Sequence, residues 1–134
     1  MGLSAALKNL LDDFQTHYQI QECALQLDDI DNCFPPKWRT IIYRIIQELL
    51  TNISKHAEAT WVSITTKIIG KKVLIEIKDN GRGFDSPQVT SLGTPKSGLG
   101  LLVIAERIKM LGGHLDIHSQ PNQGTQVSIT IPVF

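Results

Sequence analysis

The stretch KDNGRGF places a carboxylate and two glycines at the end of an apolar strand pattern. Val73, Ile75 and Ile77 alternate with other residues along this strand, and Asp79 falls in phase with them. A buried ionised carboxylate is costly unless it has a partner. Asp79 is therefore expected to accept a hydrogen bond from a ligand N–H at the mouth of a pocket. The alternative is an ordinary surface turn, because Asp-Asn-Gly is also a strong turn sequence.

A second polar group lies on the longest predicted helix. Glu48, Asn52 and Lys55 stand at positions i, i+4 and i+7, which puts them on one side of a helix, with His56 at the margin. Carboxylate and amide oxygens suit Mg²⁺, and an ammonium group suits phosphate. The same stripe could also be a solvated helix face with a favourable Glu–Lys spacing.

Further glycines and one threonine complete the set of candidate groups. Gly81 and Gly83 permit positive φ and a close approach of a ligand to the backbone. The segment SGLGLLVI puts Gly98 and Gly100 at a helix start, where free N–H groups favour phosphate, although ordinary helices also begin this way. Thr125 is in phase with the apolar residues of the last predicted strand, so it lines a pocket or is simply a satisfied hydroxyl in the core.

Hydrophobic periodicity predicts the elements that position these groups. Helical spacing predicts helices over 3–16, 37–56 and 98–111, and alternation predicts strands over 20–27, 60–68, 72–78, 114–119 and 124–132. The Gly-, Ser-, Thr- and Pro-rich residues 80–97 are expected to form a mobile loop that acts as a lid, and Arg107 on the last helix is expected to face solvent. The order of elements predicts one α/β domain, a two-layer α+β sandwich in which a mixed five-stranded sheet carries three helices on one face.

Bulk composition narrows the classes of partner. The chain has 134 residues, 42% of them hydrophobic, which suffices for one domain with its own core. Its 13 basic and 13 acidic residues balance, so neither nucleic-acid binding nor membrane contact is expected. Cys23 and Cys33 have no metal-ligand spacing and are expected to remain reduced in a cytoplasmic protein.

Taken together and in this order, the four motifs resemble the boxes of the ATPase superfamily of histidine kinases, gyrase, Hsp90 and MutL, which has the Bergerat fold. QELLTNISKHA resembles the N box, DNGRGF the first glycine box, GLGLLVIAERIKMLGG the second glycine box with its helix, and GTQVSITIP the terminal Gly-Thr strand. The resemblance runs from about Tyr43 to Pro132. YRIIQELLTNISKHAEAT and the short loop between the glycine boxes look most like the catalytic domain of bacterial sensor histidine kinases, in the subgroup that partners NarL-type response regulators.

The resemblance implies how the nucleotide base would be held. Asp79 would receive the exocyclic amine of adenine, so that the missing hydrogen-bond donor would arrive with the nucleotide. Gly81 and Gly83 would shape the adenine pocket. Thr125 would support adenine through its hydroxyl and a bound water.

The resemblance also implies which residues would handle the phosphates and the metal. Asn52 would ligate Mg²⁺, and Glu48 would hold the water shell of the metal or orient and deprotonate the acceptor. Lys55 and His56 would approach the phosphates or the ribose. Further phosphate contacts would come from the lid and the second glycine box: Lys96, Gly98, Leu99, Gly100 and Leu101.

The reaction of the family is transfer of the γ-phosphoryl group of ATP to a histidine on a separate dimerisation domain. None of the four histidines of this chain has the sequence surroundings of such an acceptor. Residues 1–134 are therefore expected to be a single catalytic domain, in which 1–16 is the helix that follows an absent dimerisation domain. Alone, the domain is expected to be monomeric and to bind nucleotide with little or no autophosphorylation.

Two other functions are compatible with the motifs. An anti-sigma-type protein serine kinase would use the same boxes with a different acceptor, and phosphoserine survives acid whereas phosphohistidine does not. A non-catalytic ATP-sensing module would transfer nothing, even with a dimerisation domain supplied in trans. The intact Glu48 and Asn52 favour catalysis over this last alternative.

Overall fold

The structure is a computed structural model of the chain, and it describes residues 2–56, 59–81, 101–120 and 122–133. For residues 53–56, 101 and 102 it describes the backbone only. The predicted loop over 80–97 therefore lies almost entirely outside the described residues.

Three helices and five strands make up the described part of the chain. In order they are α1 (Leu3–Tyr18), β1 (Glu22–Leu27), α2 (Pro36–His56), β2 (Trp61–Ile69), β3 (Lys72–Asp79), α4 (Leu101–Met110), β4 (His114–Gln120) and β5 (Gly124–Pro132). All eight predicted elements are confirmed, with their described ends shifted by at most two residues. The predicted start of the last helix at residue 98 falls outside the described residues.

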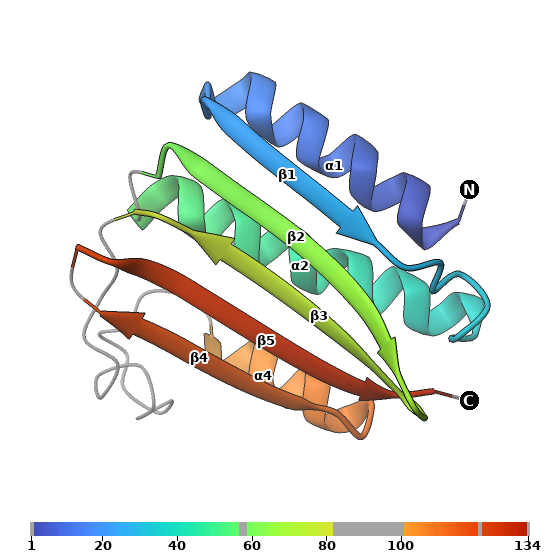
Figure 1. Cartoon of the computed structure of the whole chain (residues 1–134). Coiled ribbons are helices and arrows are strands. Elements are labelled where there is room, and N and C mark those ends of the chain that lie inside the picture. Colours follow the sequence, from blue (N-terminus) through green and yellow to red (C-terminus); the bar gives the residue numbers. More distant parts are fainter. Residues whose placement is uncertain (1, 57–58, 82–100, 121, 134) are drawn as a thin grey trace.

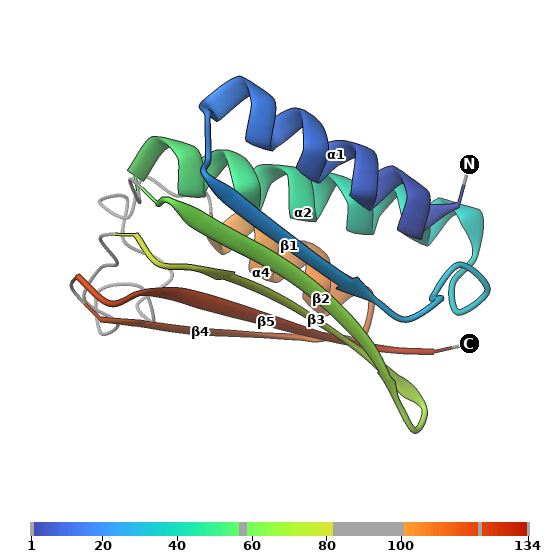
Figure 2. The same cartoon turned by 45° about the horizontal axis from the view of Figure 1, so that its top comes forward.

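The five strands form one sheet in the order β1-β2-β3-β5-β4. β1 pairs with β2 in parallel, and all other neighbours are antiparallel, so the sheet is mixed as predicted. Figures 1 and 2 show that α1, α2 and α4 all cover the same face of the sheet and leave the other face open. The predicted two-layer sandwich is confirmed.

The core lies between the sheet and the helices. Each helix contributes one apolar stripe at helical spacing, and each central strand contributes every second residue, which is the geometry that the two backbone periodicities impose. On α2 the buried stripe consists of Ile42, Ile45, Ile46, Leu49 and Leu50. On β3 it consists of Val73, Ile75 and Ile77, and Asp79 follows them onto the same buried face.

Local sequence explains where two of these elements begin and turn. Pro36 is the first residue of α2, a position where proline loses no helical hydrogen bond and already has the required φ. Gly70 has a φ of 61° in the tight turn between β2 and β3, a conformation that glycine adopts without strain. Pro36 therefore helps to determine where α2 begins, and the turn at Gly70 sets the register of the hairpin that ends at Asp79.

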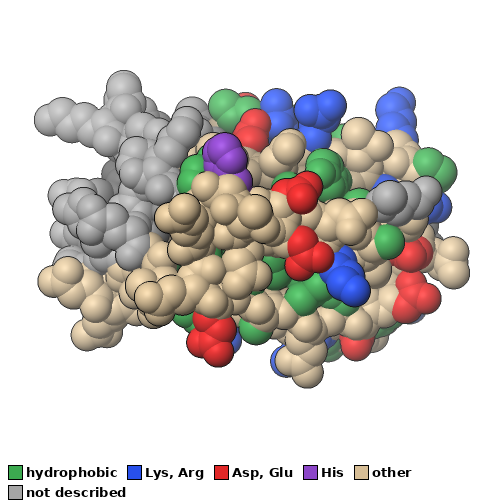
Figure 3. All heavy atoms as spheres, turned by 90° about the horizontal axis from the view of Figure 1, so that it is seen from above, with side chains coloured by type: hydrophobic (Ala, Val, Ile, Leu, Met, Phe, Trp, Pro, Cys, Tyr) green, Lys and Arg blue, Asp and Glu red, His purple; other side chains and the backbone are tan. Residues whose placement is uncertain are grey.

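The surface carries charges of both signs. Figure 3 shows acidic, basic and hydrophobic side chains interspersed over the described part of one face, with no large patch of a single sign. Cys23 and Cys33 are both free cysteines in the structure. Across the residues that the structure describes, no helix is both long enough and apolar enough to cross a membrane.

Candidate functional site

Asp79 ends β3 on the face of the sheet that the helices cover, with only 6% of its surface exposed. The predicted inward direction of this side chain is confirmed. Its Oδ1 accepts a hydrogen bond of 2.8 Å from the backbone N–H of Gly81. The turn that follows the strand therefore supplies one donor to this carboxylate, and a further donor from the nucleotide stays a prediction.

The carboxyl group of Asp79 is destabilised in its charged form. Burial raises the pKa of Asp79, and the backbone N–H groups of Gly81 and Thr125 offset part of this increase. A buried carboxyl with a perturbed pKa beside a pocket is typical of a binding or catalytic site. A ligand N–H directed at this carboxylate would offset the remaining cost of its burial.

Thr125 lies next to Asp79 as its register partner on β5. Its Oγ1 is 2.9 Å from Oγ of Ser119, and the Ser119 hydroxyl is also 3.1 Å from the carbonyl oxygen of Gly124, which it can reach as donor. Thr125 therefore has a hydrogen-bond partner in the protein and a fixed position beside the carboxylate. Sequence reasoning missed Ser119, although its phase with Leu115 and Ile117 along β4 is a readable signal.

Gly124 allows β5 to begin against the end of β3. Its φ is 87°, in the region that favours glycine. A Cβ atom at this position would overlap the carbonyl oxygen of Asp79 and would lie 3.0 Å from Cα of Asn80. The glycine of the Gly-Thr pair is thus required by a close approach of two backbones at the site.

Asn80 ties the end of β3 to the start of β2. Its Oδ1 accepts hydrogen bonds from the backbone N–H groups of Thr60 and Trp61 at 3.0 and 2.9 Å, and its Nδ2 donates to Oγ1 of Thr60 at 2.9 Å. The sequence indicated only a turn here. The structure gives the residue after Asp79 a role in holding the neighbouring strand.

A pocket of about 360 Å³ opens at this end of the sheet, and Asp79, Gly124 and Thr125 contribute to its lining. Lys78 and Gln126 also line it. Because successive strand residues point to opposite faces, these two belong to the open side of the sheet. The lining therefore comes from both faces at the end of the sheet rather than from the helix-covered face alone.

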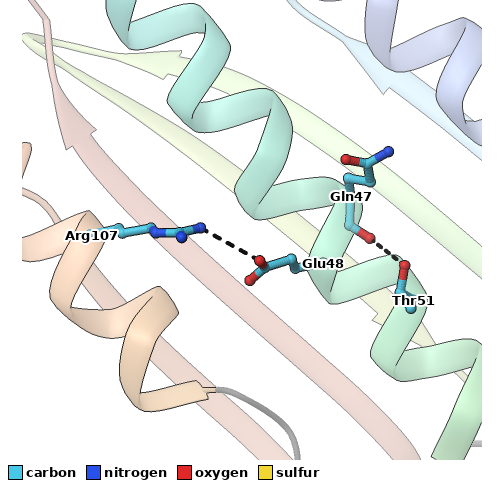
Figure 4. A network of polar contacts seen from close by, with 4 residues as sticks. All are labelled: Gln47, Glu48, Thr51 and Arg107. Atoms are coloured by element: carbon cyan, nitrogen blue, oxygen red, sulfur yellow. Dashed lines mark hydrogen bonds and ion pairs between the residues drawn. The ribbon is translucent and has the colours of Figure 1, made fainter.

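The polar stripe on α2 contacts α4. Nη1 of Arg107 lies 3.5 Å from Oε1 of Glu48, and Figure 4 shows the two side chains directed at each other across the space between the helices. Arg107 remains partly exposed, as its predicted outward position requires, and its long side chain also reaches sideways to α2. Asn52 lies one helical turn beyond Glu48 and is half-buried.

Several predicted site residues lie beyond what the structure describes. Gly83, Lys96, Gly98, Leu99 and Gly100 are outside the described residues, as are the side chains of Lys55, His56 and Leu101. Among the described residues, no three His, Cys, Asp or Glu side chains are grouped so that they could hold a metal ion.

A family assignment follows from comparison with known proteins. Residues 39–134 match the model of the family described as histidine kinase-, DNA gyrase B-, and HSP90-like ATPase. The chain belongs to this ATPase family. The predicted resemblance to this ATPase superfamily is confirmed, and ATP is the nucleotide that a domain of this family binds.

Among curated relatives, the ATPase domain is 33% identical over 133 residues to the signal transduction histidine-protein kinase/phosphatase DegS of Brevibacillus brevis. The match covers 99% of this chain and 33% of DegS, so the chain spans about a third of the length of that relative.

Solved histidine kinases share the fold. The histidine kinase domain of the blue-light activated histidine kinase of Erythrobacter litoralis superposes with a TM-score of 0.80 at 21% identity, covering 99% of this chain and 62% of that one. The Acinetobacter baumannii histidine kinase AdeS gives a TM-score of 0.77 at 22% identity, with 99% and 66% covered.

Proposed function

We propose that this chain is the catalytic domain of a sensor histidine kinase, which binds Mg-ATP and transfers the γ-phosphoryl group to a histidine on a separate phosphoacceptor domain. The single observation that carries the proposal is the buried Asp79 beside Thr125 at the pocket, within a chain of this ATPase family. The similarity to DegS over nearly the whole chain favours a histidine kinase over other members of the family.

In this proposal the nucleotide base is held by direct hydrogen bonding. Asp79 accepts a hydrogen bond from the exocyclic amine of adenine, and Gly81 keeps the carboxylate aimed at the base through its backbone N–H. Thr125, fixed by Ser119, lies against the same edge of the base. A polar group that is buried in the free protein gains a partner on binding, so the fit discriminates against bases that lack the amine.

The residues on α2 fit a divalent cation. Asn52 would offer an amide oxygen as a ligand for Mg²⁺, and Glu48, one helical turn away, would hold a water of the metal's shell, which are hard-oxygen groups suited to this cation. When bound, Mg²⁺ neutralises charge on the phosphate oxygens during transfer. In the transfer step, Glu48 would accept the proton of the attacking imidazole. Phosphoryl transfer of this kind depends mainly on positioning and electrostatic stabilisation.

The proposal includes the partners that such a domain needs. The chain acts in two-component signalling on a dimerisation and phosphoacceptor domain of the same kinase, and the phosphate then passes to a NarL-type response regulator.

The proposal also covers the domain organisation and the rest of the nucleotide site. Residues 1–134 form one cytoplasmic domain, monomeric when isolated, in which 1–16 follows the dimerisation helices. Gly83, Lys96, Gly98, Leu99, Gly100 and Leu101 complete the nucleotide site with Lys55 and His56.

Two experiments together test this function. Nucleotide binding is measured by thermal unfolding of the chain with and without Mg-ADP, because a ligand at 100 times its dissociation constant stabilises the folded state by about 2.7 kcal/mol. Transfer is measured by adding γ-labelled ATP and the phosphoacceptor domain of the same kinase. We expect an acid-labile, base-stable label on the acceptor, weaker Mg²⁺-dependent binding for Asn52→Ala, and no transfer for that variant.

Three results would contradict the proposal. Acid-stable label would point to a serine kinase. Nucleotide binding without any transfer would point to an ATP-sensing module. Undiminished transfer by Asn52→Ala would remove the metal-binding role of that residue.

A further inference from the structure

Helices α2 and α4 are bridged by one side-chain pair above the sheet. Nη1 of Arg107 on α4 and Oε1 of Glu48 on α2 are 3.5 Å apart, although the residues are 59 positions apart in the sequence. Figure 4 shows Arg107 extended from its helix toward Glu48, while the Thr51 hydroxyl bonds within α2 to the carbonyl of Gln47.

Both ends of this bridge are attached to buried structure. Ile104 and Ile108, which flank Arg107 on α4, are completely buried, and Ile45 and Leu49 bury the α2 turn that carries Glu48. The backbones at the two ends are therefore held in place by the core. The two side chains therefore extend from fixed backbone positions, and a planar guanidinium group orients a carboxylate better than a flexible ammonium does.

The contact between Arg107 and Glu48 contributes little to the stability of the fold. The side chains of Arg107 and Glu48 are 42% and 48% exposed, and exposed ion pairs contribute little to stability. The position of the contact, beside the proposed general base, is what suggests a role in function. Glu48 is the residue that the proposed function uses as base, and the contact engages Oε1, whereas no hydrogen bond or ion pair joins Oε2 to any other residue in the described ranges.

We propose that Arg107 is a positioning residue for phosphoryl transfer, which holds Glu48 by Oε1 so that Oε2 is directed at the acceptor imidazole. The inference rests on the proposed function. In the assisted step, the imidazole nitrogen forms a bond to the γ-phosphorus while the bond from that phosphorus to the bridging oxygen of ADP breaks. The imidazole proton passes to Oε2 of Glu48, and ADP leaves with the electron pair of the broken bond.

The test uses single-turnover transfer from Mg-ATP to the phosphoacceptor domain of the same kinase, together with nucleotide binding. We expect Arg107→Ala to lower the transfer rate by about 10-fold or more, as the loss of an oriented general base does, while the dissociation constant for Mg-ATP stays within about twofold. Arg107→Lys should restore part of the rate. Lys109→Ala is the matched control, because it removes a charge of the same sign from the same last turn of α4 and should leave the rate unchanged.

A double-mutant cycle shows whether Arg107 acts through Glu48. In a Glu48→Gln background, the additional Arg107→Ala change should have no further effect on the rate. An equal loss in both backgrounds, or a loss no larger than that of Lys109→Ala, overturns the inference. If the wild type binds nucleotide but transfers no phosphate, the proposed function is wrong, and this inference is wrong with it. Normal wild-type transfer with an unaffected Arg107→Ala overturns the inference alone.

Discussion

Asp79 on β3 and Thr125 on β5 lie directly opposite each other in the sheet. They belong to the row of side chains at which the helix-covered face changes from apolar to polar. Across β2, β3, β5 and β4, the next row inward is apolar and contains Ile64, Ile77, Val127 and Ile117. In the row that contains Asp79 and Thr125, β2 still contributes Val62, but β4 contributes Ser119. The same side-chain alternation that builds the core therefore places a carboxylate and two hydroxyls at one end of it, so the proposed nucleotide site continues the rows of the core with polar residues.

Replacing the Asp79 carboxylate by an amide should abolish nucleotide binding without unfolding the protein. Asp79→Asn keeps an oxygen that can accept from Gly81, so we expect the free energy of unfolding to change by less than about 1 kcal/mol. The anionic acceptor proposed for adenine is lost, so the stabilisation by Mg-ADP should disappear. Thermal unfolding with and without Mg-ADP measures both effects.

The control for this variant is Glu76→Gln, which neutralises a carboxylate on the same strand but on the open face, where it pairs with Lys78 at 3.5 Å. This control should keep the full shift with Mg-ADP. A nucleotide shift of normal size in Asp79→Asn would show that Asp79 does not receive the base.

The raised pKa of Asp79 gives the stability a pH dependence of definite sign. Burial raises the pKa in the folded state above its value in the unfolded chain, so between these two values the folded state binds more protons. Stability from this group therefore increases as the pH falls through the folded-state pKa, and is lowest when the group is ionised in both states. We expect the unfolding free energy of the wild type to rise relative to Asp79→Asn as the pH is lowered below neutrality, as measured by urea unfolding. A relative fall over the same range would mean that hydrogen bonding outweighs desolvation.

Gly124 is predicted to be the least replaceable described glycine at the site. Gly124→Ala combines a positive φ with overlap against the carbonyl of Asp79, so we expect a loss of stability of about 2 kcal/mol or more and weakened nucleotide binding. Gly70→Ala is the control, since its φ is also positive but nothing lies near the added Cβ. It should cost about 1 kcal/mol and leave binding intact. Equal costs for the two variants, by denaturant unfolding, would argue against the close contact.

Much of this fold could be predicted from sequence because periodicity reports directly on burial. The stripe of α2 and the alternation of β3 determine which residues face the core, and Asp79 and Thr125 were found by their phase with that pattern. Contacts between distant segments carry no such signal. Sequence placed Arg107 on an outward face, and only the spatial arrangement of α2 and α4 reveals that its side chain reaches Glu48.

The contacts that follow β3 differ in how far the sequence indicates them. The hydrogen bond from the N–H of Gly81 to Asp79, two residues earlier, is that of an Asx turn, which the Asp-Asn-Gly sequence favours. The partners of Asn80 are 20 and 19 residues away on the neighbouring strand. Asx-Gly sequences indicate a turn, but not which distant N–H groups the side chain will meet.

Asn80 is predicted to matter for the fold more than its exposed position suggests. Asn80→Ala would leave the N–H groups of Thr60 and Trp61 without their side-chain acceptor, which should cost about 1–2 kcal/mol. Asn80→Asp keeps the acceptor oxygens and should lose less, which denaturant unfolding would show. If both variants were as stable as the wild type, water would replace the side chain without cost.

The hydroxyl groups of Ser119 and Thr125, beside the Asp79 carboxylate, lead to a prediction about nucleotide affinity as well as stability. Ser119→Ala removes the partner 2.9 Å from Oγ1 of Thr125 and should cost about 1 kcal/mol of stability. Because the Thr125 hydroxyl then loses its fixed orientation next to Asp79, we also expect Mg-ADP to bind a few-fold more weakly, as measured by calorimetry. Ser128→Ala, which removes a hydroxyl from β5 in contact with Gln126, is the control and should leave affinity unchanged. If Thr125→Val weakens binding while Ser119→Ala does not, Thr125 contacts the nucleotide without needing Ser119 to orient it.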